Sequence, residues 1–271
     1  MDVLGSIKAR YQRYIIRNFS KTKYAETIKQ LHDSAKQPVC FIIGHGPSLT
    51  AADLDWLADN KLPAFGVNRI NKIFNQTKWR PTYYVCVDPV MVENNEKNMI
   101  EIPAKSKLIP IDYKFYHGID LPGFDYINAN YDREKDGSES FSMDCTQQVN
   151  IRSTVTVACI QLAIHMGYRE IYLLGIDHSF NHVILDKGRT VKDDSVKNYF
   201  VEDYDTDVQD KVVHDIGQTT KDYQDMQKFC LNHGIQVINA SRKTQLEVFP
   251  RVSFDQFKEQ YKREKSEVGK R

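Results

Sequence analysis

Short apolar runs alternate with amphipathic segments along most of the chain, and this alternation predicts a β-sheet covered by helices. Six runs rich in β-branched and aromatic residues have the length of buried strands: Val39–Ile43, Ala64–Val67, Tyr83–Val87, Lys107–Pro110, Glu170–Leu174 and Gln236–Ile238. Apolar residues at helical spacing lie between them, at Thr50–Asn60, Arg69–Asn75, Val90–Met99, Ser153–Met166 and Thr219–His233. This order is typical of an α/β fold, a mostly parallel sheet with helices on both faces.

Composition divides the chain into three parts. Residues 1–36 are rich in Lys and Arg and are predicted to form two short helices. Residues 37–250 form the predicted α/β domain, and residues 251–271 a charged helix. Within the domain, the polar segment 179–218 is much longer than an ordinary connection, and we interpret it as a lid insertion.

Charge and cysteine content exclude several classes of protein. The formal net charge of +1 argues against a nucleic-acid partner that would need a chain-wide basic surface. The five cysteines are scattered and odd in number, so neither a disulfide framework nor a zinc site is indicated. No apolar run approaches the roughly 20 residues that span a bilayer, and no signal-peptide core is evident. We therefore expect a cytoplasmic protein.

The basic segment 1–36 has two interpretations. Six cations could face anionic lipid, namely Lys8, Arg10, Arg13, Arg17, Lys21 and Lys23. The protein would then lie peripherally at the inner face of the membrane. The simpler interpretation is that these helices pack on the body or on a partner subunit in a homo-oligomer.

A glycine loop follows the first strand directly, and a predicted helix follows the loop. The sequence Gly44-His45-Gly46-Pro47-Ser48 would place backbone N–H groups where a phosphate can approach. No lysine follows in the manner of a Walker loop, and Pro47 interrupts the dinucleotide pattern. An ordinary strand-to-helix turn, with Ser48 or Thr50 capping the helix, is the alternative.

Polar residues follow several of the other strands. Asn68, Asp88 and Asp177 each come after a predicted strand end. Since ligands of open α/β sheets bind outside the carboxyl ends of the strands, these side chains are candidate nucleotide contacts. Each alone could equally cap a helix or form a turn.

Three motifs resemble those of bacterial lipooligosaccharide sialyltransferases: Gly44–Leu49 with Asn68, Asn150–Thr154, and Gly167–Asp177. Their order and spacing match across most of residues 39–240. The set is also similar to a wider superfamily that contains motility-associated flagellin glycosyltransferases and 6-hydroxymethylpterin diphosphokinase-like proteins. The resemblance implies that residues 37–250 are a Rossmann-like, nucleotide-binding catalytic domain. The protein would then be a metal-independent, cofactor-free glycosyltransferase. It would pass a CMP-activated, sialic-acid-like nonulosonic acid to a glycan or lipid-linked acceptor.

The resemblance also implies roles for particular residues. The donor-binding residues are Gly44, His45, Gly46, Pro47, Ser48, Asn68, Asp88, Asn150, Ser153, Thr154 and Asp177. Arg152 matches a family arginine, whose planar guanidinium suits an acidic donor. The catalytic histidine of the family falls at Gln218, so His214, one helical turn away, or His178 is expected to be the general base. Ser179 replaces a tyrosine expected to bind the leaving phosphate.

Two other functions stay open. One is an ATP- and Mg²⁺-dependent diphosphokinase of the 6-hydroxymethylpterin type, with Asp88, Asp177 and the lid aspartates as metal ligands. The other is a catalytically silent nucleotide-binding module. A metal site at Asp177, His178 and His182 is not assigned, because the segment lacks the helix that this spacing would require.

Overall fold

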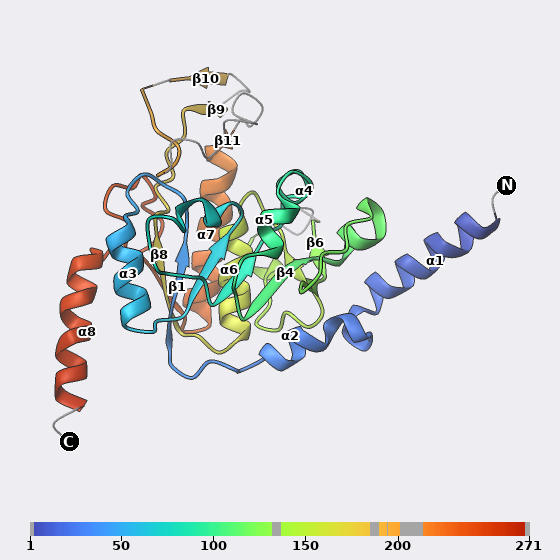
Figure 1. Ribbon diagram of the computed structural model, residues 1–271, viewed down its shortest axis with the longest axis horizontal. Coiled ribbons are helices and arrows are strands. Elements are labelled where there is room, and N and C mark those ends of the chain that lie inside the picture. The colour runs from blue at the N-terminus through green and yellow to red at the C-terminus, as the bar shows by residue number, and fades with distance from the viewer. Residues whose placement is uncertain (1–2, 132–136, 185–189, 194, 201–213, 269–271) are drawn as a thin grey trace.

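The computed structural model describes residues 3–131, 137–184, 190–193, 195–200 and 214–268. Its centre is a seven-stranded, wholly parallel sheet in the order β12-β8-β1-β2-β3-β4-β5. The strands are β1 Val39–Ile43, β2 Ala64–Val67, β3 Tyr83–Val85, β4 Ser106–Pro110, β5 Asp125–Ile127, β8 Glu170–Leu174 and β12 Gln236–Asn239. The predicted α/β, Rossmann-like class is thus confirmed (Figure 1).

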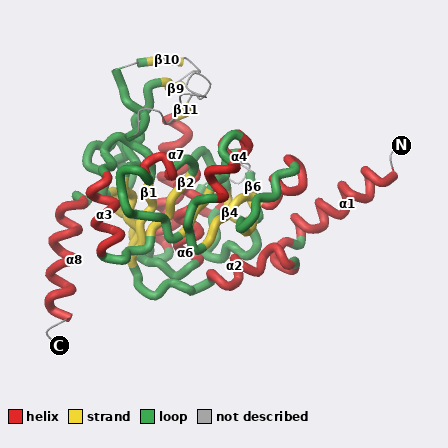
Figure 2. Tube along the Cα trace, viewed as in Figure 1, coloured by secondary structure: helices red, strands yellow, loops and turns green. Residues whose placement is uncertain are grey.

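Helices cover both faces of the sheet, and loops connect the helices to the strands (Figure 2). The α-helices are α1 Val3–Arg17, α2 Glu26–Leu31, α3 Ala51–Asp59, α4 Pro89–Glu93, α5 Glu96–Ile100, α6 Val155–His165, α7 Ile216–Asn232 and α8 Phe254–Val268. Two small sheets pair β6 Ala129–Asn130 with β7 Val149–Asn150, and β9 His182–Ile184 with β10 Thr190–Lys192 and β11 His214–Asp215.

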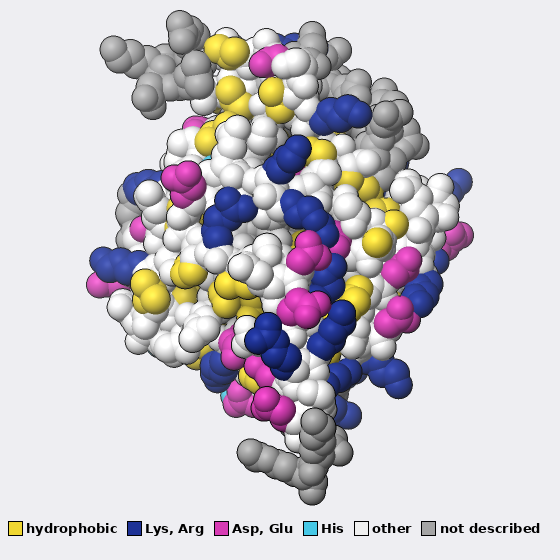
Figure 3. Space-filling view, turned by 90° about the vertical axis from the view of Figure 1, so that its left-hand side faces the viewer, with side chains coloured by type: hydrophobic (Ala, Val, Ile, Leu, Met, Phe, Trp, Pro, Cys, Tyr) yellow, Lys and Arg dark blue, Asp and Glu magenta, His cyan; other side chains and the backbone are white. Residues whose placement is uncertain are grey.

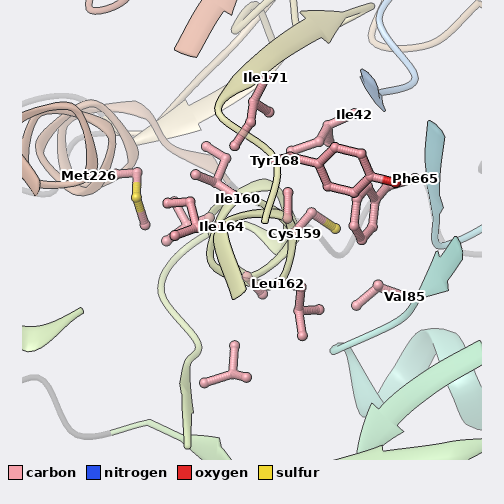
Figure 4. Packing of buried hydrophobic residues seen from close by; sticks show 14 of the residues in the cluster. Ile42, Phe65, Val85, Cys159, Ile160, Leu162, Ile164, Tyr168, Ile171 and Met226 are labelled. Atoms are coloured by element: carbon pink, nitrogen blue, oxygen red, sulfur yellow. The ribbon is translucent and has the colours of Figure 1, made fainter. Parts of the chain in front are cut away.

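The strands are apolar on both faces because the protein has a core on each side of the sheet. In β1, Cys40 and Ile42 join the core under α6 and α7, while Phe41 and Ile43 join the core under α3 and α8. Figure 4 shows the first of these cores, where α6 supplies several of the packed side chains. The buried run of α6 extends from Thr156 to His165, so this helix is enclosed on every side.

The order of strands reverses between β1 and β8. From β1 the chain adds β2 to β5 in sequence on one side, and only later returns to place β8 on the other side. Ile43, the last residue of β1, is level with Gly66 of β2 and Leu174 of β8. The loops after β1 and β8 therefore meet at the point where open α/β sheets bind their ligands.

Several predicted elements differ from the structure. The predicted helix Val90–Met99 is two short helices, α4 and α5, because Asn94 and Asn95 interrupt it and α5 starts afresh from Asn95. The predicted helix Arg69–Asn75 is a 3₁₀ turn at Ile70–Ile73. The prediction missed β5, β6 and β7, which are only two or three residues long.

The terminal segments behave differently from one another. In the basic segment, Ile28 and Leu31 of α2 are buried in the core under α6 and α7, whereas α1 projects away from the body (Figure 1). At the other end, α8 packs Phe254 and Phe257 against the sheet residue Phe41. None of the described helices is long and apolar enough to cross a membrane.

Candidate functional site

The glycine loop is bound along its length to the loop that follows β8. The N–H of Gly44 donates to the Leu174 carbonyl and the N–H of Gly46 to the Gly175 carbonyl, each at 2.8 Å. A Cβ at Gly44 would overlap the Gly175 carbonyl oxygen, and a Cβ at Gly46 would overlap the Asp177 carboxylate. The glycines are therefore required by the close approach of two loops, a packing reason that the Gly-x-Gly pattern alone did not indicate.

Asp177 completes this contact between the loops. Its side chain is buried and accepts hydrogen bonds from the Ser48 N–H at 2.8 Å and from the Ser48 hydroxyl. Burial raises the pKa of Asp177, and the Ser48 bonds oppose that shift. Ser48 is thus not the helix cap, and Thr50 caps α3 instead. With these N–H groups donated inside the protein, a phosphate contact there stays a prediction.

Replacing Asp177 separates its structural role from its charge. Asp177→Asn is expected to change the free energy of unfolding by less than about 1 kcal/mol, because an amide can still pair with both Ser48 groups. Asp177→Ala leaves the buried Ser48 N–H without its acceptor and should cost about 1–3 kcal/mol. Denaturant unfolding of both variants measures the difference, and equal losses would contradict this role.

One residue of the segment predicted to be a lid, Phe200, packs on the glycine loop. Phe200 stacks on the His45 ring with centroids 6.0 Å apart, and its N–H donates to the His45 carbonyl at 2.9 Å. Burial lowers the pKa of His45 to about 3, although a hydrogen bond with the Val67 backbone opposes the shift. His45 is therefore neutral at pH 7, and its imidazole adds no positive charge for a phosphate.

Asn68 and Asp88 lie at the same edge of the sheet, each with partners of its own. Asn68 has a left-handed backbone, with φ of 45°, and its carbonyl accepts the Tyr84 hydroxyl at 2.5 Å. Asp88 caps α4 by accepting the Val90 N–H at 2.9 Å. The capping role is the alternative that the sequence left open for Asp88. Nucleotide contacts by either residue remain predictions.

Asn150 and Arg152 converge on one serine. The Arg152 guanidinium donates to the Ser140 hydroxyl at 2.6 Å, and the Asn150 amide donates to the Ser140 carbonyl. Both side chains are buried, and the guanidinium also lies over the Phe141 ring, 5.6 Å from its centroid. Arg152 therefore sits at the entrance to α6, held among polar and aromatic groups.

Ser153 and Thr154 join the start of α6 to the start of α7. The backbone N–H and the hydroxyl of Ser153 donate to Asp222 at 2.9 and 2.6 Å, and Gln218 donates to the other oxygen of Asp222 at 2.9 Å. Thr154 caps α6. Gln218, at the histidine position of the resembled family, thus has a structural partner. A sugar contact by Ser153 and Thr154 stays a prediction.

His178 contacts residues of α7, although it directly follows Asp177, which contacts the glycine loop. Its backbone is left-handed, with φ of 53°, which is uncommon for a residue with a Cβ. The side chain is buried, its Nε2 lies 2.8 Å from the Thr220 hydroxyl, and its ring contacts the Tyr223 ring. Burial lowers the pKa of His178, so the imidazole is neutral at pH 7.

The Thr220 hydroxyl fixes the tautomer of His178. Thr220 has one hydroxyl proton, which it donates to the Ile216 carbonyl at 2.8 Å. Its oxygen must therefore accept a proton from Nε2 of His178. Because a neutral imidazole carries only one N–H, Nδ1 of His178 holds the free electron pair, and Nδ1 is the atom able to accept a proton.

His178 and Thr220 lie in the wall of a cavity of about 610 Å³. The cavity is formed between α7 and residues 245–248, which follow β12. Its volume is within the range of small-molecule sites. Its lining combines four side-chain amides, two charged side chains and three apolar ones, namely Gln224, Gln227, Asn232 and Gln245, Lys228 and Glu247, and Leu231, Leu246 and Val248.

The two predicted bases lie on different elements of the structure. His214 lies in β11, a strand before α7, and so is not one helical turn from Gln218 as predicted; its imidazole lies outside the described side chains, as does that of His182. Asp177 and His178 face different partners, and no cluster of three potential metal ligands occurs within the described ranges.

Sequence reasoning missed Thr220, Phe200 and the residues 245–248. One signal was available for Thr220, because Asp215 followed by Gln218 is a helix-start pattern, and α7 does begin at Ile216, earlier than predicted. The other contacts join segments far apart in the chain, for which no local pattern exists.

Two solved structures are similar to this chain. The first is the MAf glycosyltransferase from Magnetospirillum magneticum AMB-1, with a TM-score of 0.49, 15% identity, and coverage of 83% of this chain but only 35% of that one. The second is the sialyltransferase CstII from Campylobacter jejuni in complex with a substrate analogue, cytidine-5'-monophosphate, with a TM-score of 0.47, 16% identity, and coverage of 81% and 86% of the two chains.

Sequence comparison gives a firmer result. No curated protein matches the chain. The sequence model of a family described as 6-hydroxymethylpterin diphosphokinase MptE-like matches residues 13–183, which is more than half of the chain. This match confirms the superfamily indicated by the motifs, and the chain belongs to the 6-hydroxymethylpterin diphosphokinase MptE-like family.

Proposed function

We propose that the protein is a glycosyltransferase that takes a sugar from a nucleotide-activated donor, with a CMP-linked nonulosonic acid as the donor. The donor nucleotide would lie outside the carboxyl ends of β1 and β8. The acceptor, a glycan or glycoconjugate hydroxyl, would enter the cavity beside α7. The motif resemblance supports the donor class, and the side-chain amides among the lining residues of the cavity can hydrogen-bond the hydroxyl groups of an acceptor.

One observation carries this proposal: a buried, neutral histidine of fixed tautomer lies in the wall of the cavity, directly after the loop that contacts the glycine loop. In the proposed step, the acceptor oxygen forms a bond to the anomeric carbon of the sugar while the bond from that carbon to the phosphate oxygen breaks. CMP leaves with the electron pair, and the hydroxyl proton passes to Nδ1 of His178. Arg152 is proposed to bind the acidic group of the donor.

Thr220 is proposed as a positioning residue for His178. Thr220→Val keeps the shape of the side chain but removes the oxygen that accepts the Nε2 proton, so the base tautomer is no longer fixed. Turnover is expected to fall by about tenfold, with KM for the acceptor nearly unchanged. Thr220→Ser, which restores the hydroxyl, should recover most of that loss, and failure to recover it would contradict the positioning role.

The proposal is tested by the nucleotide that the protein releases. Incubation with CMP-sialic acid and a mixture of glycan acceptors, followed by chromatography, should show CMP release that EDTA does not reduce. Release of AMP from ATP only when Mg²⁺ and a pterin alcohol are present would contradict the proposal.

The second candidate is a pyrophosphate transfer from ATP, and the description of the matched family favours it. That chemistry needs Mg²⁺ held by carboxylates. In this structure, the Asp88 carboxylate caps α4 and the Asp177 carboxylate accepts hydrogen bonds from Ser48. Most of the lid aspartates lie outside the described residues, whereas Asp193 is described and bonds Ser195. A module that binds a nucleotide and transfers nothing is the third candidate.

A further inference from the structure

The first helix exposes a stripe of apolar side chains. Ile7, Tyr11 and Tyr14 are spaced at four and three residues and therefore share one side of α1. They are 58%, 57% and 61% exposed. Contact with the body uses a different side, where Gln12 and Ile15 are buried and the Gln12 amide donates to the Phe115 carbonyl at 2.8 Å. The stripe is thus left uncovered by the described body of the protein.

Cations surround this stripe, and no acid balances them. Residues 3–25 contain six Lys and Arg residues and no Asp or Glu, although the whole chain has a net charge of only +1. All six cations are exposed. Arg10 and Arg17 precede and follow Tyr14 by four and three residues, so they lie beside the apolar stripe.

The last helix provides an internal comparison. Like α1, α8 has 15 residues, but it carries four acidic and four basic residues. Its aromatic side packs against the body of the protein. Figure 3 views the side of the molecule that carries α8, and there acidic and basic side chains are interspersed. The unbalanced charge of the first helix and its neighbouring turns is therefore not shared by α8 or by the face of the molecule seen in Figure 3.

The positive charge of α1 decides which kind of partner can cover the apolar stripe. Pairing α1 with the α1 of a second copy would bring together two helices that carry only positive charges, and like charges at such a contact oppose association. An anionic lipid surface instead attracts each of these cations and accepts Ile and Tyr side chains among its headgroups.

We propose that α1 binds the surface of an anionic membrane, with Ile7, Tyr11 and Tyr14 inserted at the headgroup level and the flanking cations on lipid phosphates. The helix then lies in the plane of the membrane, and the sheet domain stays in water beside it. This proposal does not depend on the reaction that the protein catalyses.

The experiment is co-sedimentation of the full chain with vesicles. Binding is expected with phosphatidylcholine mixed with phosphatidylglycerol, to weaken with added salt, and to be nearly absent with phosphatidylcholine alone. The triple variant Arg10→Gln/Arg13→Gln/Arg17→Gln should bind on the order of 100-fold more weakly, at about fivefold for each cation removed. The matched control Lys262→Gln/Arg263→Gln/Lys265→Gln on α8 removes as many exposed cations and should bind like the natural sequence.

A second variant separates insertion from charge alone. Ile7→Ser/Tyr11→Ser/Tyr14→Ser keeps every cation and should also bind the anionic vesicles more weakly. Because all three residues are exposed, these changes should leave thermal unfolding unchanged. Unchanged binding by this variant, as expected for a site that takes a soluble polyanion such as RNA, would overturn the proposal. Equal losses of vesicle binding in the α1 and α8 charge variants would also overturn it. So would the finding that the protein binds no vesicles but forms a dimer in sedimentation, and that the Ile7→Ser/Tyr11→Ser/Tyr14→Ser variant is a monomer.

Discussion

His178→Asn is expected to lower turnover by about 10² to 10⁴-fold while donor binding and stability stay close to those of the natural sequence. Asparagine tolerates the left-handed backbone that His178 adopts, so the change removes the imidazole without straining the loop. Alanine at the same position would mix loss of the base with loss of the backbone conformation. Turnover is measured as CMP release, and donor affinity by calorimetry.

An exposed histidine at the end of α7 provides the matched control. His233 is the C-cap residue of α7, and its ring contacts only Phe229, through the carbonyl and the ring of that residue, among the contacts described for it, so His233→Asn should leave turnover unchanged. If His178→Asn retained turnover within about twofold, His178 would not be the base. The His214 imidazole would then be the next candidate.

The pH profile gives an independent measure of the same base. A general base works only when it is deprotonated, and burial lowers the pKa of His178 below its usual 6.5. Turnover should therefore stay constant above pH 6.5 and fall only at more acidic pH, as protons bind Nδ1. In Thr220→Val the fixed tautomer is lost, so the plateau is expected to be lower.

The glycine loop provides the largest expected change in stability. Gly44→Ala would place a Cβ against the Gly175 carbonyl and the Ile176 side chain, and backbone atoms that are hydrogen-bonded in both loops cannot move away cheaply. We expect a loss of about 3 kcal/mol in the free energy of unfolding. Gly46→Ala meets the Asp177 carboxylate, a side chain that Ser48 holds in place, and should lose about 2 kcal/mol.

Gly217→Ala is the matched control for these two changes. Gly217 lies in the first turn of α7, where an added Cβ would make only an ordinary contact, 3.5 Å from Asp215 Oδ1. In a helix this change should be neutral or stabilise the protein by up to about 1 kcal/mol. Chemical denaturation measures all three. If Gly44→Ala were as stable as Gly217→Ala, the glycines would be free of this packing role, and the phosphate-binding interpretation of the loop would gain support.

The regular part of the fold could be predicted because its signals are local. Six strands of the main sheet were located from short apolar runs, and the carboxyl edge followed from the polar residues after each run. The missed strand β5 has only three residues and lies at the edge of the sheet, where little periodicity can develop. The split of α4 and α5 depends on two asparagines whose effect on a helix varies with context.

The site was predicted less completely than the fold. Asp177, His178 and Ser48 were each named from the sequence. Their different partners could not be predicted, because Asp177 bonds Ser48 and His178 bonds Thr220 through contacts between distant segments. The cavity joins α7 to residues 245–248 through contacts that have no sequence signature. From the sequence, the glycines of the loop were explained by the approach of a phosphate. In the structure, the close packing of the loop after β8 is sufficient to require them.

The most direct test of the proposed donor is a calorimetric titration of the protein with CMP, CDP, UDP, GDP and ATP, each with and without Mg²⁺. Binding of CMP that is selective and independent of the metal is the predicted result. Mg²⁺-dependent binding of ATP without binding of CMP would contradict the proposed donor and favour pyrophosphate transfer.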